Sequence, residues 1–184
     1  LELTWLIPLS LIGTICGWLY FVSEHASEAL AHAIGERPVV KAMLAGLALA
    51  ICGTVLPYTM FAGETQADVL METYLTIPAG VLIATGLVKA MLTPALINLG
   101  WRGGHFFPVI FSGVSLGYGL AILTGADPVF CVAVCTASTM GAVMRQPVMV
   151  VGLLLMCFSL KGIVCMIIAA VIAAGIPLPK PLRK

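Results

Sequence analysis

The residues with the clearest chemical meaning form a glycine motif in the middle of an apolar chain. Gly103-Gly104-His105-Phe106-Phe107-Pro108 is followed by Gly113 and Gly117 at four-residue spacing. Paired glycines lower helix stability and favour a turn, whereas the apolar stretch after them suits a helix. A helix that begins inside a membrane exposes several unpaired N–H groups and the positive end of its dipole. This arrangement predicts a site for an anion.

The composition of the chain places this motif in a membrane protein. Of 184 residues, 61% are hydrophobic and only 9% are charged, whereas about a quarter of the residues in a soluble domain are charged. The formal net charge of +1 gives no electrostatic basis for binding nucleic acid. The chain starts at Leu1-Glu2-Leu3, without a Met or the basic start of a signal peptide. We therefore expect either a fragment or a chain that begins inside a longer protein.

Six hydrophobic segments are expected to position the motif. They cover residues 3–23, 39–56, 76–97, 105–124, 128–144 and 146–175. The last is interrupted at Ser159-Leu160-Lys161-Gly162, which leaves two pieces shorter than the about 20 residues of a perpendicular span. Short segments broken by glycine or proline are typical of transporters whose helices stop partway through the membrane. We predict an all-α integral membrane protein with tilted and partly broken helices, organised as a single transmembrane domain over residues 1–184 with no separate soluble domain.

Polar residues between these segments are expected to meet water. Residues 24–38 are the most polar stretch, and residues 58–72 predict a mixed loop that carries Glu64 and Asp68. The first stretch contains Glu24, His25, Glu28 and His32 at helical spacing. Such spacing is typical of a solvated helix face and, as the less favoured alternative, of a proton relay. Two basic clusters indicate cytoplasmic ends. They are Arg37 with Lys41, and Lys180, Arg183 and Lys184 in the tail.

The six cysteines all fall in apolar stretches, where a free thiol behaves as a small hydrophobic side chain. They are Cys16, Cys52, Cys131, Cys135, Cys157 and Cys165. Cys131 and Cys135 lie one helical turn apart, but no histidine or carboxylate lies beside them to complete a metal site. We expect neither disulfides nor a metal site. A cation or metal carrier that uses these two cysteines is the least favoured function.

Three segments together resemble the chloride channel and transporter (CLC) family. The glycine motif is similar to the family's GGxFxP-x4-G-x3-G signature. Upstream, Cys52-Gly53-Thr54-Val55-Leu56-Pro57 is similar to the stretch before the family's central loop. Downstream, Met140-Gly141-Ala142-Val143-Met144-Arg145-Gln146-Pro147 resembles its G-A-x-x-x-x-x-R-x-P stretch, with one spacing difference. The resemblance covers essentially the whole chain, but only the C-terminal half of a family member.

The resemblance implies transport of a small inorganic anion, chloride first of all, and no enzymatic activity. It implies one half of an inverted-repeat fold in a multi-pass protein of the cell membrane. The backbone amides of His105, Phe106 and Phe107 would bind the anion, while Gly103, Gly104 and Pro108 shape the loop. No resident cofactor is expected beyond a bound chloride or similar anion. The complete protein is expected to be a homodimer, with its contact face on the first span and on the two short helices within 146–175.

Several side chains near the motif allow more than one role. His105 either acts as a pH-sensitive group beside the anion or packs and contributes only its backbone, which we favour. Lys89 lies deep in a hydrophobic segment, where a charge is costly, and is a possible positive charge along the anion path. For Arg145 we favour a helix-end cation that contacts backbone or reaches the interface. Gly113 and Gly117 are expected to allow close helix packing rather than to line an ion path.

Two departures from the family pattern leave an alternative function open. The gating glutamate motif of the GREGP type, which belongs to the family's first half, does not occur in these residues. Pro181-Leu182-Arg183 stands where the family often has Pro-Leu-Tyr. The alternative is a degenerate or regulatory half-protein that acts as a non-transporting membrane subunit.

Overall fold

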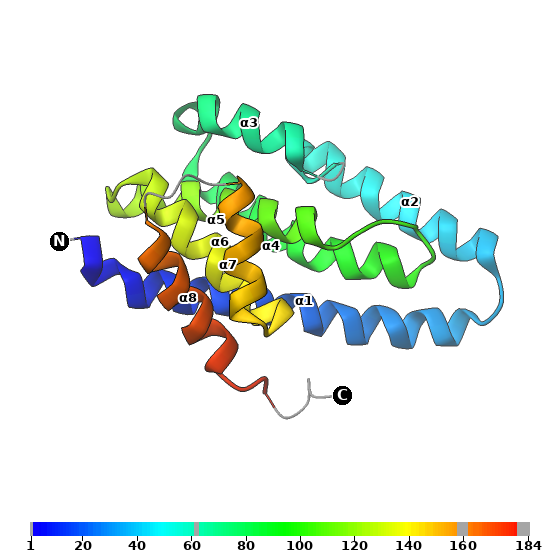
Figure 1. The fold of residues 1–184 in the computed structure, drawn as a ribbon. Helices are drawn as coiled ribbons and strands as arrows, with labels where there is room; N and C mark the ends of the chain where they lie inside the picture. Colours follow the sequence, from blue (N-terminus) through cyan, green and yellow to red (C-terminus); the bar gives the residue numbers. More distant parts are fainter. Residues whose placement is uncertain (1, 61–62, 158–161, 180–184) are drawn as a thin grey trace.

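The structure is a computed structural model that describes residues 2–60, 63–157 and 162–179 (Figure 1). The elements that these residues form are helices. The long ones are α1 (Leu6–Ile34), α2 (Pro38–Val55), α4 (Ala79–Asn98), α5 (Phe106–Thr124) and α6 (Pro128–Met144), and the short ones are α3 (Glu64–Thr73), α7 (Pro147–Cys157) and α8 (Ile163–Gly175). Single 3-10 turns, η1 (Glu2–Trp5), η2 (Pro57–Thr59) and η3 (Tyr74–Thr76), accompany α1, α2 and α3.

Helix length and composition confirm an all-α membrane protein. Four helical stretches are long and apolar enough to cross a membrane: Leu3–Ile34, Pro38–Val55, Ala79–Asn98 and Phe106–Thr124. α7 and α8 have only 11 and 13 residues. At about 1.5 Å per residue, neither reaches across a hydrocarbon core of about 30 Å. Of the predicted interruption, Ser159 to Lys161 lie outside the described residues, and so do the basic tail residues Lys180, Arg183 and Lys184.

α5 and α6 form the centre of the bundle, between α1 on one side and α2 with α3 on the other (Figure 1). Both helices are buried over most of their length. The glycines of the motif allow their close crossing. A Cβ added at Gly113 would lie 2.5 Å from the Cα of Thr136, and one added at Gly117 would lie 2.5 Å from the Cα of Val132. The expected packing role of these glycines is therefore confirmed.

The first helix is longer than its predicted apolar span of residues 3–23. It continues through the polar stretch to Ile34 and ends at Gly35, which has a positive φ of 69°. The polar side chains are used to attach this extension to α4. Ser23 Oγ donates to the carbonyl of Met91 (2.6 Å), and the Asn98 amide donates to Ser27 Oγ (2.9 Å). Because the extension packs against α4, the polar stretch is not solvated along its whole length. His32 is exposed, whereas Glu24, His25 and Glu28 are half-buried.

The prediction of a loop over residues 58–72 is wrong, because this segment contains helix α3. Gly63, with a φ of 107°, leads into the helix at Glu64. Ala67, Leu70 and Tyr74 follow one another at helical spacing, and all three pack against the core. Glu64 and Asp68 are exposed and, with Ala67, line a cavity that α5 also lines. They are therefore helix-surface charges rather than loop charges.

Candidate functional site

α4 ends in a turn at Gly100, just before the glycine motif. Gly100 has a φ of 97°, and its N–H donates to the carbonyl of Ile97 (3.0 Å). The N–H of Trp101 donates to the carbonyl of Leu96 (3.0 Å). This pair of bonds is a Schellman motif, which satisfies the last carbonyls of a helix. The chain thus leaves the helix at Gly100, while Gly103 and Gly104 continue as irregular backbone without a positive φ.

α5 begins with unpaired amide donors. Its first internal bond runs from the N–H of Val109 to the carbonyl of His105 (3.1 Å). Pro108 has no N–H to leave unpaired, which suits a first helical turn. Among the described residues, no acceptor faces the N–H groups of His105, Phe106 or Phe107. Three donors are therefore available at the positive end of a 19-residue helix.

The side chain of His105 lies toward α1 and packs on that of Phe106. The imidazole stacks on the Phe106 ring, with a centroid separation of 4.6 Å and an interplanar angle of 19°. On its other side it approaches the ring of Tyr20, at 6.4 Å between centroids. Tyr20 is buried on α1. The two residues thus present their N–H groups while their rings form a small aromatic cluster.

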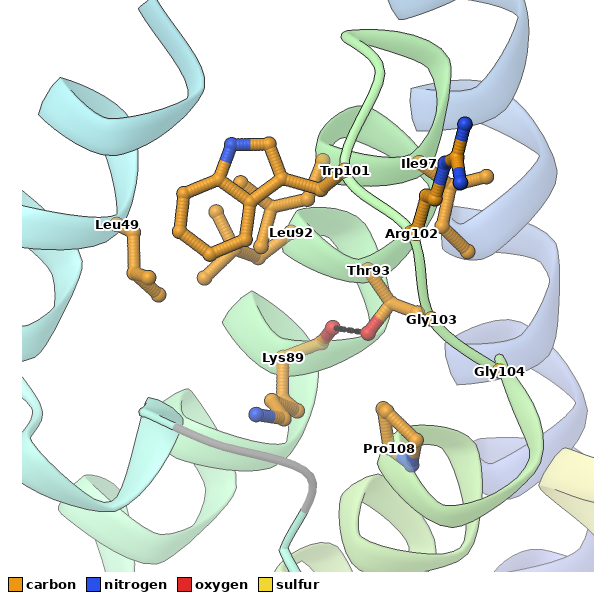
Figure 2. Close-up of a pocket in the computed structure, with 11 residues that line it drawn as sticks. Leu49, Lys89, Leu92, Thr93, Ile97, Trp101, Arg102, Gly103, Gly104 and Pro108 are labelled. Atoms are coloured by element: carbon orange, nitrogen blue, oxygen red, sulfur yellow. Dashed lines mark hydrogen bonds between the residues drawn. The ribbon is translucent and has the colours of Figure 1, made fainter. Parts of the chain in front are cut away.

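A cavity of about 270 Å³ lies beside the glycine loop (Figure 2). Gly103, Gly104 and Pro108 form one wall, and Lys89 with Thr93 belongs to the opposing helix α4. The other lining residues are Leu49, Leu92, Leu96, Ile97, Trp101 and Arg102. The Arg102 guanidinium points away from Lys89 (Figure 2). The cavity is therefore mostly apolar, with one ammonium group in its wall.

Lys89 is the charge buried at this cavity. Its side chain is 4% exposed, and Nζ donates to the carbonyl of Thr59 (2.6 Å). Nζ also lies 6.0 Å from the centroid of the Phe111 ring, at a distance that suits a cation–π contact. The Thr93 hydroxyl donates to the carbonyl of Lys89 (2.8 Å), one residue before Pro94 in the helix. A carbonyl and an aromatic face thus surround an ammonium group that would be costly inside a membrane without them.

The structure brings together some of the predicted site residues and separates others. Lys89, Gly103, Gly104 and Pro108 share the cavity of Figure 2. Phe107 lines a second cavity of about 340 Å³ on the side of α3. Sequence reasoning missed Thr59, whose carbonyl accepts from Lys89, and it missed Thr93, Trp101 and Arg102, which line the same cavity. No periodic signal distinguishes these residues along the chain.

Arg145 acts as a cap between two helices, in agreement with the favoured prediction. It follows α6 with a φ of 56°, in the left-handed region. Its guanidinium donates to the carbonyls of Ile176 (3.1 Å) and Ala174 (3.0 Å). These carbonyls belong to the C-terminal end of α8, where backbone acceptors lack helical partners and a positive charge is favourable.

The cysteines occur as free thiols. Cys16, Cys131 and Cys135 are buried, Cys52 and Cys165 are half-buried, and Cys157 is exposed. Within residues 2–60, 63–157 and 162–179, no group of three His, Cys, Asp or Glu side chains gathers at one place. The described residues give no support to a metal carrier.

Comparison with protein families shows the family to which the chain belongs. A family model described as voltage gated chloride channel matches residues 1–177. The chain belongs to the voltage gated chloride channel family. The comparison with curated proteins and the comparison with solved structures each gave no match.

Membership of the voltage gated chloride channel family confirms the resemblance that the three sequence segments predicted. In the structure, each segment lies at a junction between elements. The stretch from Cys52 to Pro57 joins α2 to η2, the glycine motif leads into α5, and the stretch from Met140 to Pro147 joins α6 to α7. The three segments that resemble the family therefore lie where helices begin or end.

Proposed function

We propose that this chain contributes to the transmembrane transport of a small inorganic anion, chloride first of all, at the start of α5. The observation that carries the proposal is the set of three unpaired N–H groups at His105, Phe106 and Phe107. Amide dipoles stabilise an anion without a full positive charge that would trap it, which suits conduction. Transport then requires no covalent chemistry, since the anion exchanges water for amide donors and moves on.

Lys89 would act on this path through its electrostatic potential. Its ammonium lies in the wall of the cavity that Gly103, Gly104 and Pro108 also line. Because Nζ donates to the carbonyl of Thr59, it would not bind the anion directly. A charge buried in low dielectric attracts an anion over a longer range than an exposed one. The cavity is thus an approach to the amides rather than the binding point itself.

The assembly follows from the same proposal. We propose that the chain forms one half of an inverted-repeat fold, in which a second half supplies the opposing donors. The complete protein would be a homodimer in the cell membrane. The contact face would include α7 and α8, which are too short to span the bilayer alone.

The test is chloride flux into liposomes that contain the full-length protein. Phe106→Pro removes one amide donor at the first helical residue, and it also disfavours the αR backbone conformation of His105 before it. Phe106→Ala removes the same ring and keeps the amide. A hydrogen bond to a charged group contributes about 1.5–3 kcal/mol. We expect flux to fall at least about tenfold further in the proline variant than in the alanine variant.

The comparison with Phe106→Ala separates the amide from the ring, and a single symmetric elution peak verifies that both variants fold. Equal flux in the two variants would show that this amide does not bind the anion. Chloride binding by the wild-type protein without any flux would favour the alternative, a non-transporting membrane subunit.

A further inference from the structure

We propose that the cavity between α3 and α5 is a binding site for an amphipathic organic cation, a molecule in which an ammonium group is attached to an apolar body. The cavity has a volume of about 340 Å³, and pockets for small organic molecules commonly measure about 300–1,000 Å³. The site uses the ring of Phe107 and not its amide. The inference therefore goes beyond the proposed function and does not depend on it.

The two walls of this cavity differ in polarity. On one side lies the short helix α3, whose Glu64 and Asp68 are exposed at the cavity. On the other side lies α5, which is apolar and long enough to span a membrane. It contributes the side chains of Phe107, Ile110, Phe111, Val114 and Tyr118. A ligand that contacts both walls must itself have a polar end and an apolar end.

The polar wall favours a positive charge. Glu64 and Asp68 are four residues apart on α3, so their carboxylates share one helix face, where like charges repel. None of the described residues that line the cavity is basic. Lys89 approaches the Phe111 ring at 6.0 Å, but its Nζ donates to the carbonyl of Thr59 and it lines the other cavity. A bound cation would offset the repulsion between the two carboxylates, whereas an anion would add to it.

The apolar wall offers an aromatic face to the same cation. The side chain of Phe107 is 47% exposed, whereas Phe111 and Tyr118 are buried. The Tyr118 ring also stacks on Tyr74, with 4.6 Å between the ring centroids, so one of its faces is covered. Phe107 is therefore the ring that a ligand reaches from outside. An aromatic face attracts an ammonium group, and quaternary ammonium groups are commonly recognised in this way.

Other classes of ligand match only one of the two walls. A metal ion would use the carboxylates alone, and the described residues bring together no group of three His, Cys, Asp or Glu side chains. A neutral hydrocarbon chain would fill the apolar wall and make no use of Glu64 and Asp68. An amphipathic cation uses both walls at once.

The experiment is calorimetric titration of the full-length protein in a non-ionic detergent with benzyltrimethylammonium, at a constant chloride concentration. We expect the wild type to bind this cation about tenfold more tightly than tetramethylammonium, which lacks the apolar body, or benzyl alcohol, which lacks the charge. Combining Glu64→Gln with Asp68→Asn should weaken the binding of benzyltrimethylammonium about tenfold. Phe107→Leu, which keeps the backbone amide, should weaken it about fivefold. Glu72→Gln removes a carboxylate of α3 that does not line this cavity, and it should keep the wild-type affinity.

The outcomes separate this inference from simpler sites and from the proposed function. Equal affinities for benzyltrimethylammonium and tetramethylammonium would show a plain cation site and overturn the proposal. Benzyl alcohol that binds as tightly as benzyltrimethylammonium would show a merely apolar cavity and also overturn it. No binding to the wild type, or unchanged binding in the double variant, overturns it as well, and none of these results bears on chloride flux. If the double variant does not give a single elution peak, Phe107→Leu and the three ligands on the wild type still decide the question.

Discussion

At the scale of single residues, Lys89 shows how a buried charge is held inside an apolar bundle. Its ammonium has a backbone carbonyl at 2.6 Å and an aromatic ring at 6.0 Å, and it lies in the cavity wall. Position within a hydrophobic segment was enough to single this residue out. Its partners were not predictable, because Thr59 and Phe111 lie 30 and 22 residues away along the chain.

Lys89→Met should lower chloride flux through the full-length protein by about tenfold, because it removes the positive potential beside the amide donors. The reduction should be larger at low ionic strength, where screening is weaker. The measurement is flux at two salt concentrations. Lys41→Met, on α2 and away from this cavity, is the matched control. Equal flux in Lys89→Met and wild type would exclude an electrostatic role.

Arg145 permits a second prediction at the scale of single residues. Its side chain stabilises the fold, whereas its left-handed backbone conformation destabilises it. Arg145→Ala loses both guanidinium bonds to the end of α8 but keeps the left-handed φ of 56°. Arg145→Gly loses the same bonds and relieves about 1–2 kcal/mol of backbone strain. Melting temperatures in detergent should therefore rank wild type above Arg145→Gly, and Arg145→Gly above Arg145→Ala. A melting temperature of Arg145→Ala equal to or above that of Arg145→Gly would contradict this ranking.

At the scale of elements, the close crossing of α5 and α6 depends on two glycines, Gly113 and Gly117, which have no side chain. Gly113→Ala and Gly117→Ala would press a methyl group against the backbone of α6, at 2.5 Å from Cα atoms that cannot rotate away. Overpacking of this kind costs about 1–3 kcal/mol. We expect both variants to unfold at lower temperature and to carry less chloride, since α5 also presents the amides.

Gly152→Ala on α7 is the control for these variants. Among the described residues, no heavy atom beyond the neighbouring residues and backbone of α7 itself lies within 4 Å of a Cβ built at Gly152. Its stability should be unchanged or higher by up to about 1 kcal/mol, because alanine favours the helix. Equal melting temperatures for all three glycine variants would show that the crossing is not tightly packed.

Elements were predictable to different degrees, for identifiable reasons. Residues 128–144 coincide with α6, because Pro128 and the Arg145–Pro147 junction mark its ends in the sequence. Helix α3 was not predicted, and the polar stretch up to Ile34 was predicted as a helix face but not as a continuation of the first span. Both are polar on one side and depend on tertiary contacts for the other, so average hydrophobicity does not identify them. Leu70, the fully buried residue of α3, carries little signal alone.

At the scale of the whole molecule, apolar surface remains uncovered on α7 and α8. Val148, Met156, Val164 and Val171 are exposed, with Met156 at 87%. Together with their short length, this surface supports the proposed homodimer contact. The outer face of α2 is also apolar, but this helix is long enough to be covered by lipid alone.

A dimer through α7 and α8 predicts cross-linking through the exposed thiol of Cys157. A bifunctional thiol reagent should give a dimer of the full-length protein in membranes, and Cys157→Ser should abolish it. Val164→Trp should shift the purified protein toward the monomer by light scattering, because it enlarges an interface side chain. Leu47→Trp on the outer face of α2 should not. Monomer formation in both tryptophan variants, or in neither, would argue against this interface.

The sequence by itself determined the class of this protein, because its cause is local. Hydrophobicity decides which segments enter the bilayer, and glycine spacing decides where the backbone can turn or pack closely. It identified a membrane-embedded helical chain and the residues where a helix starts with unpaired amides. Only the tertiary structure decided what surrounds those amides. The partners of Lys89 and the approach of His105 to Tyr20 depend on contacts between segments distant in sequence. Such contacts follow from the packing of whole helices, which no short motif specifies.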